Sequence, residues 1–141
     1  MTPEFLSAVV DTLLPGDQGV PPLPTGTAAG VATNLEHVVA TRDREVRDVV
    51  LGAIASATGG EGAFVRADPA GRISSVERVE REMPGPFHAL VALVLRDYYE
   101  AETVLLAMGW RVEPPQPDGH VVQAFDEALL GPVRARARTW R

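Results

Sequence analysis

Apolar residues recur at helical spacing in several separate stretches of the chain, and no stretch shows the alternation typical of a half-buried strand. The amino-terminal stretch is one example. Thr2 can cap a helix, and Pro3 suits the first helical position because its missing N–H costs nothing there. The pattern therefore predicts a helix that begins at Thr2 and ends at Pro15-Gly16-Asp17. Its single apolar stripe comprises Phe5, Leu6, Val9, Val10 and Leu13.

Two more helices are predicted in the first half of the chain, after a loop rich in proline and glycine that ends at Gly26. One helix covers about Ala28 to Thr41. The next starts from Asp43, whose side chain can cap it, and closes at Gly59-Gly60. The composition of the loop does not decide whether it is ordered or mobile. A solvated charged face is expected for Arg42, Arg44, Glu45, Arg47 and Asp48.

The second half of the sequence predicts two longer helices. A turn is expected at Asp68-Pro69-Ala70-Gly71, and Ser74 with Glu77 fits a capping box that opens the first helix. Pro84-Gly85-Pro86 stops that helix. The following segment, from Phe87 to Tyr99, is the most apolar of the chain and should lie at the centre of a bundle. Its expected stripe is Phe87, Leu90, Val91, Val94, Leu95 and Tyr98, with Leu93 on a second apolar side.

The carboxy-terminal third combines a short helix, a stiff arm and a last helix. The short helix ends at Gly109, a natural left-handed cap, and Trp110 starts the arm. Three prolines between Glu113 and Asp118 favour an extended polyproline II conformation. The last helix is expected at about Val122 to Ala137, kinked or restarted at Pro132. The sequence thus predicts an all-α protein with a single helical domain over residues 1–141. It should be a compact bundle of about six to seven helices, with a proline-rich extended arm before the last helix.

Composition and charge narrow the functions that this chain can perform. A chain of 141 residues can bury an adequate core, and it has no cysteine for disulfides, thiolate nucleophiles or thiolate metal sites. The formal net charge is −6, which argues against nucleic-acid binding. No run approaches the roughly 20 apolar residues of a membrane span, so no direct membrane insertion is expected. The amino terminus carries Glu4 and Asp11 where a secretory signal would be positively charged.

Candidate catalytic groups are scattered rather than grouped. His37, His88 and His120 are far apart in sequence, and none has a metal-spaced neighbour on its own helix. Asp97 beside Tyr98 could orient a phenol for proton transfer. A structural role is favoured instead, in which Tyr98 continues the core stripe and Asp97 anchors the following turn. We therefore expect no catalytic residue, cofactor site or metal site on this chain.

Two features favour binding to another protein. Aromatic anchors and preordered extended segments bind protein surfaces at low entropic cost, which suits Trp110 and the arm. The alternative is that the arm folds back and Trp110 plugs the core of its own bundle. Near the carboxy terminus, Arg134 and Arg136 belong to a cluster of four arginines that can pair with an acidic partner surface. The other two are Arg138 and Arg141.

Several short motifs are distributed along nearly the whole chain. The amino-terminal helix ends in Leu13-Leu14-Pro15-Gly16-Asp17, and the apolar helix ends in Asp97-Tyr98-Tyr99. Met108-Gly109-Trp110 follows. The remaining motifs are Pro115-Gln116-Pro117-Asp118-Gly119-His120 and Leu130-Gly131-Pro132-Val133-Arg134-Ala135-Arg136, near a terminal Trp140-Arg141. Together these motifs resemble the gluconate 2-dehydrogenase subunit 3 family.

This resemblance implies a non-catalytic accessory subunit that binds and stabilises, or helps mature, a large flavoprotein. That partner would be an FAD-binding oxidoreductase of the glucose-methanol-choline (GMC) type that oxidises sugars, glycosides or polyols, so FAD is expected in the partner and not on this chain. The expected contact residues are Tyr98, Tyr99, Trp110, Pro115, Pro117, His120, Arg134 and Arg136.

Two questions stay open from the sequence. Family members often carry a twin-arginine export signal, which is not present here. The complex is therefore expected in the cytoplasm, or in the periplasm if a signal was removed or the partner carries one. The alternative function is a stand-alone helical module that binds a small molecule or regulates another process.

Overall fold

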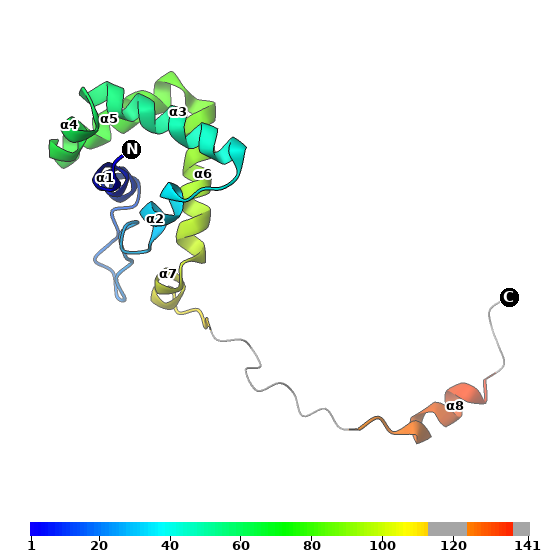
Figure 1. Ribbon diagram of the computed structural model, residues 1–141. Helices are drawn as coiled ribbons and strands as arrows, with labels where there is room; N and C mark the ends of the chain where they lie inside the picture. The colour runs from blue at the N-terminus through cyan, green and yellow to red at the C-terminus, as the bar shows by residue number, and fades with distance from the viewer. Residues whose placement is uncertain (113–123, 137–141) are drawn as a thin grey trace.

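The computed structural model describes residues 1–112 and 124–136, and within these ranges the chain forms helices and loops without a strand. The predicted all-α class and the compact helical bundle are thereby confirmed. Figure 1 shows α6 passing through the bundle, with α7 at its carboxy-terminal end. Most of the predicted arm lies outside the described residues, and so do Pro115, Pro117 and His120.

The first helix, α1 (Pro3–Leu13), has the predicted start. The Thr2 hydroxyl oxygen accepts a hydrogen bond from the Phe5 N–H at 3.3 Å, and Pro3 occupies the first turn. The side chains of Phe5, Val9 and Val10 are fully buried. Gly26 packs against this helix so closely that a Cβ atom there would collide with the Val10 side chain. The loop between α1 and α2 is thus held close to the bundle at Gly26.

The second predicted helix is much shorter than expected. Residues 26–30 form a turn that ends with Gly30 at φ +83°, and α2 (Val31–Glu36) spans fewer than two turns. The third helix, α3 (Thr41–Thr58), begins two residues before the predicted Asp43 cap and ends at Gly59 as predicted. A left-handed residue cannot continue a helix, which is why Gly30 excludes residues 28–30 from α2.

The expected solvated face of α3 is wrong for Arg47, whereas Arg44 is exposed as expected. The Arg47 guanidinium donates hydrogen bonds to the carbonyl oxygens of Leu35 and Glu36, both at 2.9 Å, and pairs with Asp48 at 2.8 Å. Its side chain is only 14% exposed. Arg44 donates to the Val38 and Val39 carbonyls at 3.3 to 3.4 Å. Both arginines therefore satisfy the carbonyls that the short α2 and its connection leave without helical partners.

The next two helices differ from the predicted boundaries. The short helix α4 (Glu61–Arg66) was not predicted, and its Phe64 packs edge-to-face on Phe5 with ring centroids 5.5 Å apart. Helix α5 (Pro69–Glu82) begins where a turn was expected. Asp68 caps it by accepting the Gly71 N–H at 2.8 Å, so the predicted capping box at Ser74 lies inside the helix and does not open it.

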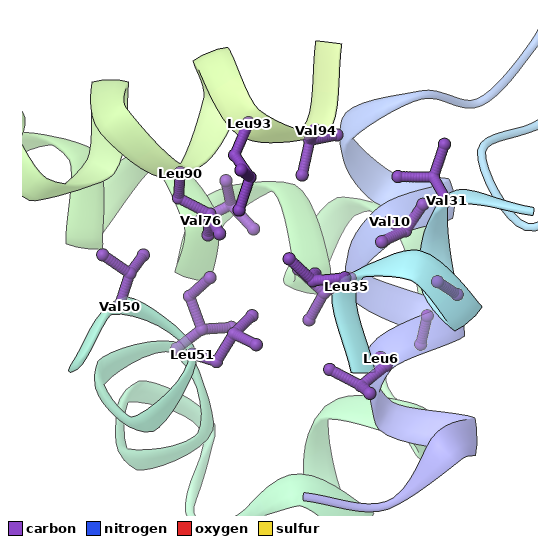
Figure 2. Packing of buried hydrophobic residues seen from close by; sticks show 14 of the residues in the cluster. Leu6, Val10, Val31, Leu35, Val50, Leu51, Val76, Leu90, Leu93 and Val94 are labelled. Carbon is purple, nitrogen blue, oxygen red and sulfur yellow. The ribbon is translucent and has the colours of Figure 1, made fainter. Parts of the chain in front are cut away.

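The most apolar segment is the centre of the bundle, as predicted. Helix α6 (Pro84–Glu100) contacts α2, α3, α5 and α7. Figure 2 shows Leu90, Leu93 and Val94 projecting into the hydrophobic cluster. One detail of the expected stripe is wrong: Leu93 is buried at 6% exposure, whereas Leu95 is 36% exposed. The buried face therefore runs through Leu93 because α3 covers that side of the helix.

The chain continues into α7 (Glu102–Ala107), the short helix predicted before Gly109. After the residues that are not described, a 3-10 helix, η1 (Glu127–Leu130), leads into α8 (Gly131–Arg134). The last helix, predicted at about residues 122–137, is shorter in the structure, since helical turns cover only residues 127–134 of the described range. Pro132 lies in the first turn of α8, so the predicted restart at this proline is confirmed.

Arg47→Ala should destabilise the protein by about 2 kcal/mol, because it leaves two α2 carbonyls without their charged donor. Urea unfolding followed by circular dichroism measures this free energy. Arg81→Ala is the matched control, since Arg81 is 69% exposed in a surface ion pair, and it should change the stability by less than about 0.5 kcal/mol. Equal effects of the two substitutions would show that Arg47 does not stabilise the α2 terminus.

Candidate partner-binding surface

Exposed apolar side chains gather where α6 passes into α7 and the chain leaves the bundle. We call Leu106, Met108, Trp110 and Val112 the α7 face. Their side chains are 53%, 46%, 65% and 36% exposed, respectively. Leu106, Trp110 and Val112 line one shallow depression of about 290 Å³ together with Arg111. Contiguous exposed apolar surface of this kind often marks a protein interaction site.

The backbone at the end of α7 fixes the position of Trp110. Gly109 adopts φ +78°, its N–H donates to the Leu106 carbonyl at 2.9 Å, and the Trp110 N–H donates to the Leu105 carbonyl at 2.9 Å. This pair of bonds is a Schellman motif, which closes a helix with a left-handed residue. Trp110 is thus exposed on a defined backbone. The alternative, in which Trp110 plugs the core of its own bundle, is therefore wrong for this structure.

The two adjacent tyrosines have different environments. Tyr98 is 4% exposed, and its hydroxyl donates a hydrogen bond to the Pro24 carbonyl at 2.7 Å. Burial raises the pKa of this phenol. Its predicted place in the core is therefore confirmed. Tyr99 is 53% exposed and packs edge-to-face on Tyr98 with ring centroids 5.5 Å apart. Of the two tyrosines, only Tyr99 has a substantially exposed side chain, and the buried ring of Tyr98 packs against it.

The loop between α1 and α2 is organised by Asp17, a role that the sequence reasoning missed. One carboxylate oxygen accepts the N–H groups of Gly19 at 3.0 Å and Leu23 at 2.7 Å. These backbone bonds hold the pKa of Asp17 below its usual value. Val20, between the two donors, is fully exposed. The sequence did contain a signal for this role. Asp17 precedes Gly19 by two residues, which is the pattern of an Asx-turn, in which the aspartate side chain accepts a backbone N–H.

The loop joins the α6 terminus through the hydrogen bond between Tyr98 and Pro24. The negative charge of Asp17 also contributes to the raised pKa of Tyr98, after burial and the neighbouring Tyr99. As a result, a fixed loop carrying an exposed valine is attached to the helix end that carries Tyr99.

The candidate catalytic residues are not brought together. His37 bonds through Nδ1 to the Thr33 carbonyl at 2.8 Å, and His88 lies 3.5 Å from Glu80. Asp97 pairs with the adjacent Arg96 at 3.3 Å rather than with the turn that follows α6, which corrects its expected role. In the ranges that the structure covers, no group of three His, Cys, Asp or Glu side chains is placed to hold a metal ion.

The two described arginines of the predicted contact set, Arg134 and Arg136, are exposed. Arg134 ends α8 and Arg136 follows it. The η1 and α8 elements pack on each other. Over the described parts of the chain, no helix is both long and apolar enough to cross a membrane.

No family model matches the chain, and comparison with curated proteins and with solved structures finds no significant match.

Asp17→Asn should lower the melting temperature at neutral pH, because an amide oxygen is a weaker acceptor for the two loop N–H groups than a carboxylate. The depressed pKa means that the carboxylate contributes stability above its unfolded pKa of about 3.9 and loses that contribution as pH falls through the lower folded value. The difference from the wild type should therefore shrink below about pH 4.

Thermal unfolding of both proteins between pH 7 and pH 2.5 measures this difference. Glu45→Gln, at an exposed position on α3, is the control and should follow the wild type throughout. A deficit of Asp17→Asn that stays constant over the whole range would contradict the assigned role of the carboxylate.

Proposed function

We propose that this chain is a non-catalytic small subunit that binds and stabilises, or helps mature, a large FAD-dependent oxidoreductase. The partner is of the GMC type and acts on sugars, glycosides or polyols. The nature of the partner rests on the sequence resemblance to the gluconate 2-dehydrogenase subunit 3 family. The observation that carries a binding role is the α7 face, with Trp110 65% exposed on a fixed backbone.

The chemistry of this surface supports binding rather than catalysis. Tryptophan is enriched among the residues that contribute most to protein association, because it buries a large area at low entropic cost. Trp110 lies three residues before residue 113, so Pro115 and Pro117 of the predicted arm follow it closely in sequence and belong to the proposed interface. Tyr99 and the Asp17-organised loop supply further exposed groups on ordered backbone. FAD belongs to the partner in this proposal.

The alternative, a stand-alone small-molecule module, has one observation in its favour. A cleft of about 270 Å³ lies between α1 and α5, lined mainly by Thr12, Pro15, Pro69 and Ile73. Ligand sites typically enclose about 300 to 1,000 Å³ and converge on a few polar groups. Two charged residues also border the cleft, and both are already bonded: Arg72 donates to the Phe64 carbonyl at 3.2 Å, and Asp11 accepts the Thr27 N–H at 2.8 Å. This cleft is therefore weaker support for a small-molecule module than the α7 face is for binding to a partner protein.

Co-expression with a GMC-type oxidoreductase encoded beside it should give a yellow complex with sugar- or polyol-oxidising activity. The chain alone should purify colourless and inactive. Flavin absorbance, co-elution and dye reduction with a panel of sugars measure the outcome. Oxidation of a sugar by the isolated chain would refute the proposal, and so would failure of the two chains to co-elute.

Within that complex, Trp110→Ala should weaken association by about 2 kcal/mol or more, because a central aromatic anchor would be lost. Calorimetric titration measures the affinity. Val39→Ala is the control, since Val39 is 82% exposed in the connection between α2 and α3, away from the α7 face in sequence. An affinity that is unchanged by Trp110→Ala would remove the α7 face from the interface.

A further inference from the structure

A second exposed surface lies along the contact between α3 and α6. The two helices form a groove of about 440 Å³. Its apolar floor comes from Val46 on α3 and from Ala89, Ala92 and Leu93 on α6. These three α6 residues share one face of the helix through their spacing of three and four. The groove is open at the surface, and none of its residues belongs to the α7 face.

The rim of the groove carries more positive than negative charge. Arg42 and Arg96 border it, together with a single acidic residue, Asp43. Among the residues with described positions, Arg42 makes no ion pair, and Arg96 pairs with the adjacent Asp97 at 3.3 Å. The Arg96 side chain is still 56% exposed. An occupant that combines apolar and acidic side chains would complement this groove.

The chain itself contains a segment with that chemistry. Phe125 and Leu129 are each 68% exposed, although both are large apolar residues. Asp126 and Glu127 stand between them and are exposed as well. The Asp126 carboxylate also caps η1 by accepting the Ala128 N–H at 2.9 Å, so this short turn has a defined start. We call residues 125–130 the η1 segment.

We propose that the η1 segment docks into the α3/α6 groove of its own chain. Phe125 and Leu129 would then cover the floor between Val46 and Ala92. Asp126 and Glu127 would meet Arg42 and Arg96 at the rim. The occupant is this chain's own segment because its charges oppose those of the rim, and because the described part of the chain leaves its two apolar side chains largely exposed. This inference concerns the chain alone and does not depend on the flavoprotein partner.

The chain is long enough for this contact. Residues 113–124 can span at most about 40 Å at ~3.3 to 3.6 Å per residue. Ala89 lies roughly 16 Å before the end of α6, at 1.5 Å of helical rise per residue. The covalent connection also gives the segment a high effective concentration at the groove, so modest complementarity suffices for docking.

Because the sequence contains no cysteine, two introduced cysteines can be cross-linked without competing thiols, which tests the docking directly. Ala92→Cys with Ala128→Cys places one thiol in the groove and one on the η1 segment of the full-length chain. A short bis-maleimide should cross-link this pair within the monomer roughly tenfold faster than the control pair Ser74→Cys with Ala128→Cys. Ser74 is an exposed residue on α5, outside the groove.

Charge exchange makes the test specific. Asp126→Arg with Glu127→Arg should bring the 92–128 cross-linking rate down to that of the control pair, and these residues lie outside the hydrophobic core. Adding Arg42→Glu and Arg96→Glu should restore the rate, with folding checked by circular dichroism. Equal rates for the two cysteine pairs, insensitivity to the charge changes, or cross-links formed mainly between two chains would each overturn the proposal.

Discussion

Burial of one face of α6 is the constraint on which the rest of the structure depends. Leu90 and Val94 are almost completely buried, and α2, α3 and α5 each contact this helix. The helix is amphipathic, so the elements around it must cover the apolar face and leave the other face to water. The short helix α2 packs on α1 and α6, and α4 packs on α1 and α3, with Arg47 and Arg72 bonded to carbonyls at their ends. Local propensity alone would not hold helices of six residues.

The same helix determines where the molecule presents exposed apolar surface. The hydrophobic core extends from Phe5 to Val104, and its last residues are contributed by the end of α6 and by α7. Consecutive side chains diverge around a helix, so burial of Tyr98 turns Tyr99 outward. The Schellman motif then directs the chain away from the bundle at Trp110. The exposed apolar surface at this end of the bundle is therefore a direct consequence of how the core ends.

Strong local signals made much of this fold predictable, whereas tertiary contacts decided the remainder. The start of α1 at Thr2-Pro3, the end of α3 at Gly59 and the position of α6 were predicted correctly. Helix caps and apolar periodicity are local features, so they can be recognised in the sequence. The helix start predicted at Ser74 was wrong because Asp68 and Pro69 form an equally good start for α5 earlier in the chain. Leu93 is buried because α3 covers it, which no local pattern shows. The roles of Arg47 and Asp17 depend on carbonyls and N–H groups that only the folded loop brings near. Exposure of Trp110 likewise could not be decided from its neighbours.

The central claim is that residues 1–112 hold the hydrophobic core, and that the described residues beyond them, 124–136, contribute only surface contacts. The most direct measurement is the unfolding free energy of the chain truncated after Val112, compared with the full chain in urea. The claim predicts that the truncated chain still folds and loses at most about 2 kcal/mol, the contribution of the surface contact made by the η1 segment, because the buried cluster ends at Val104. A truncated chain that fails to fold, or that loses several kcal/mol, would show that the carboxy-terminal residues belong to the core and would contradict the claim.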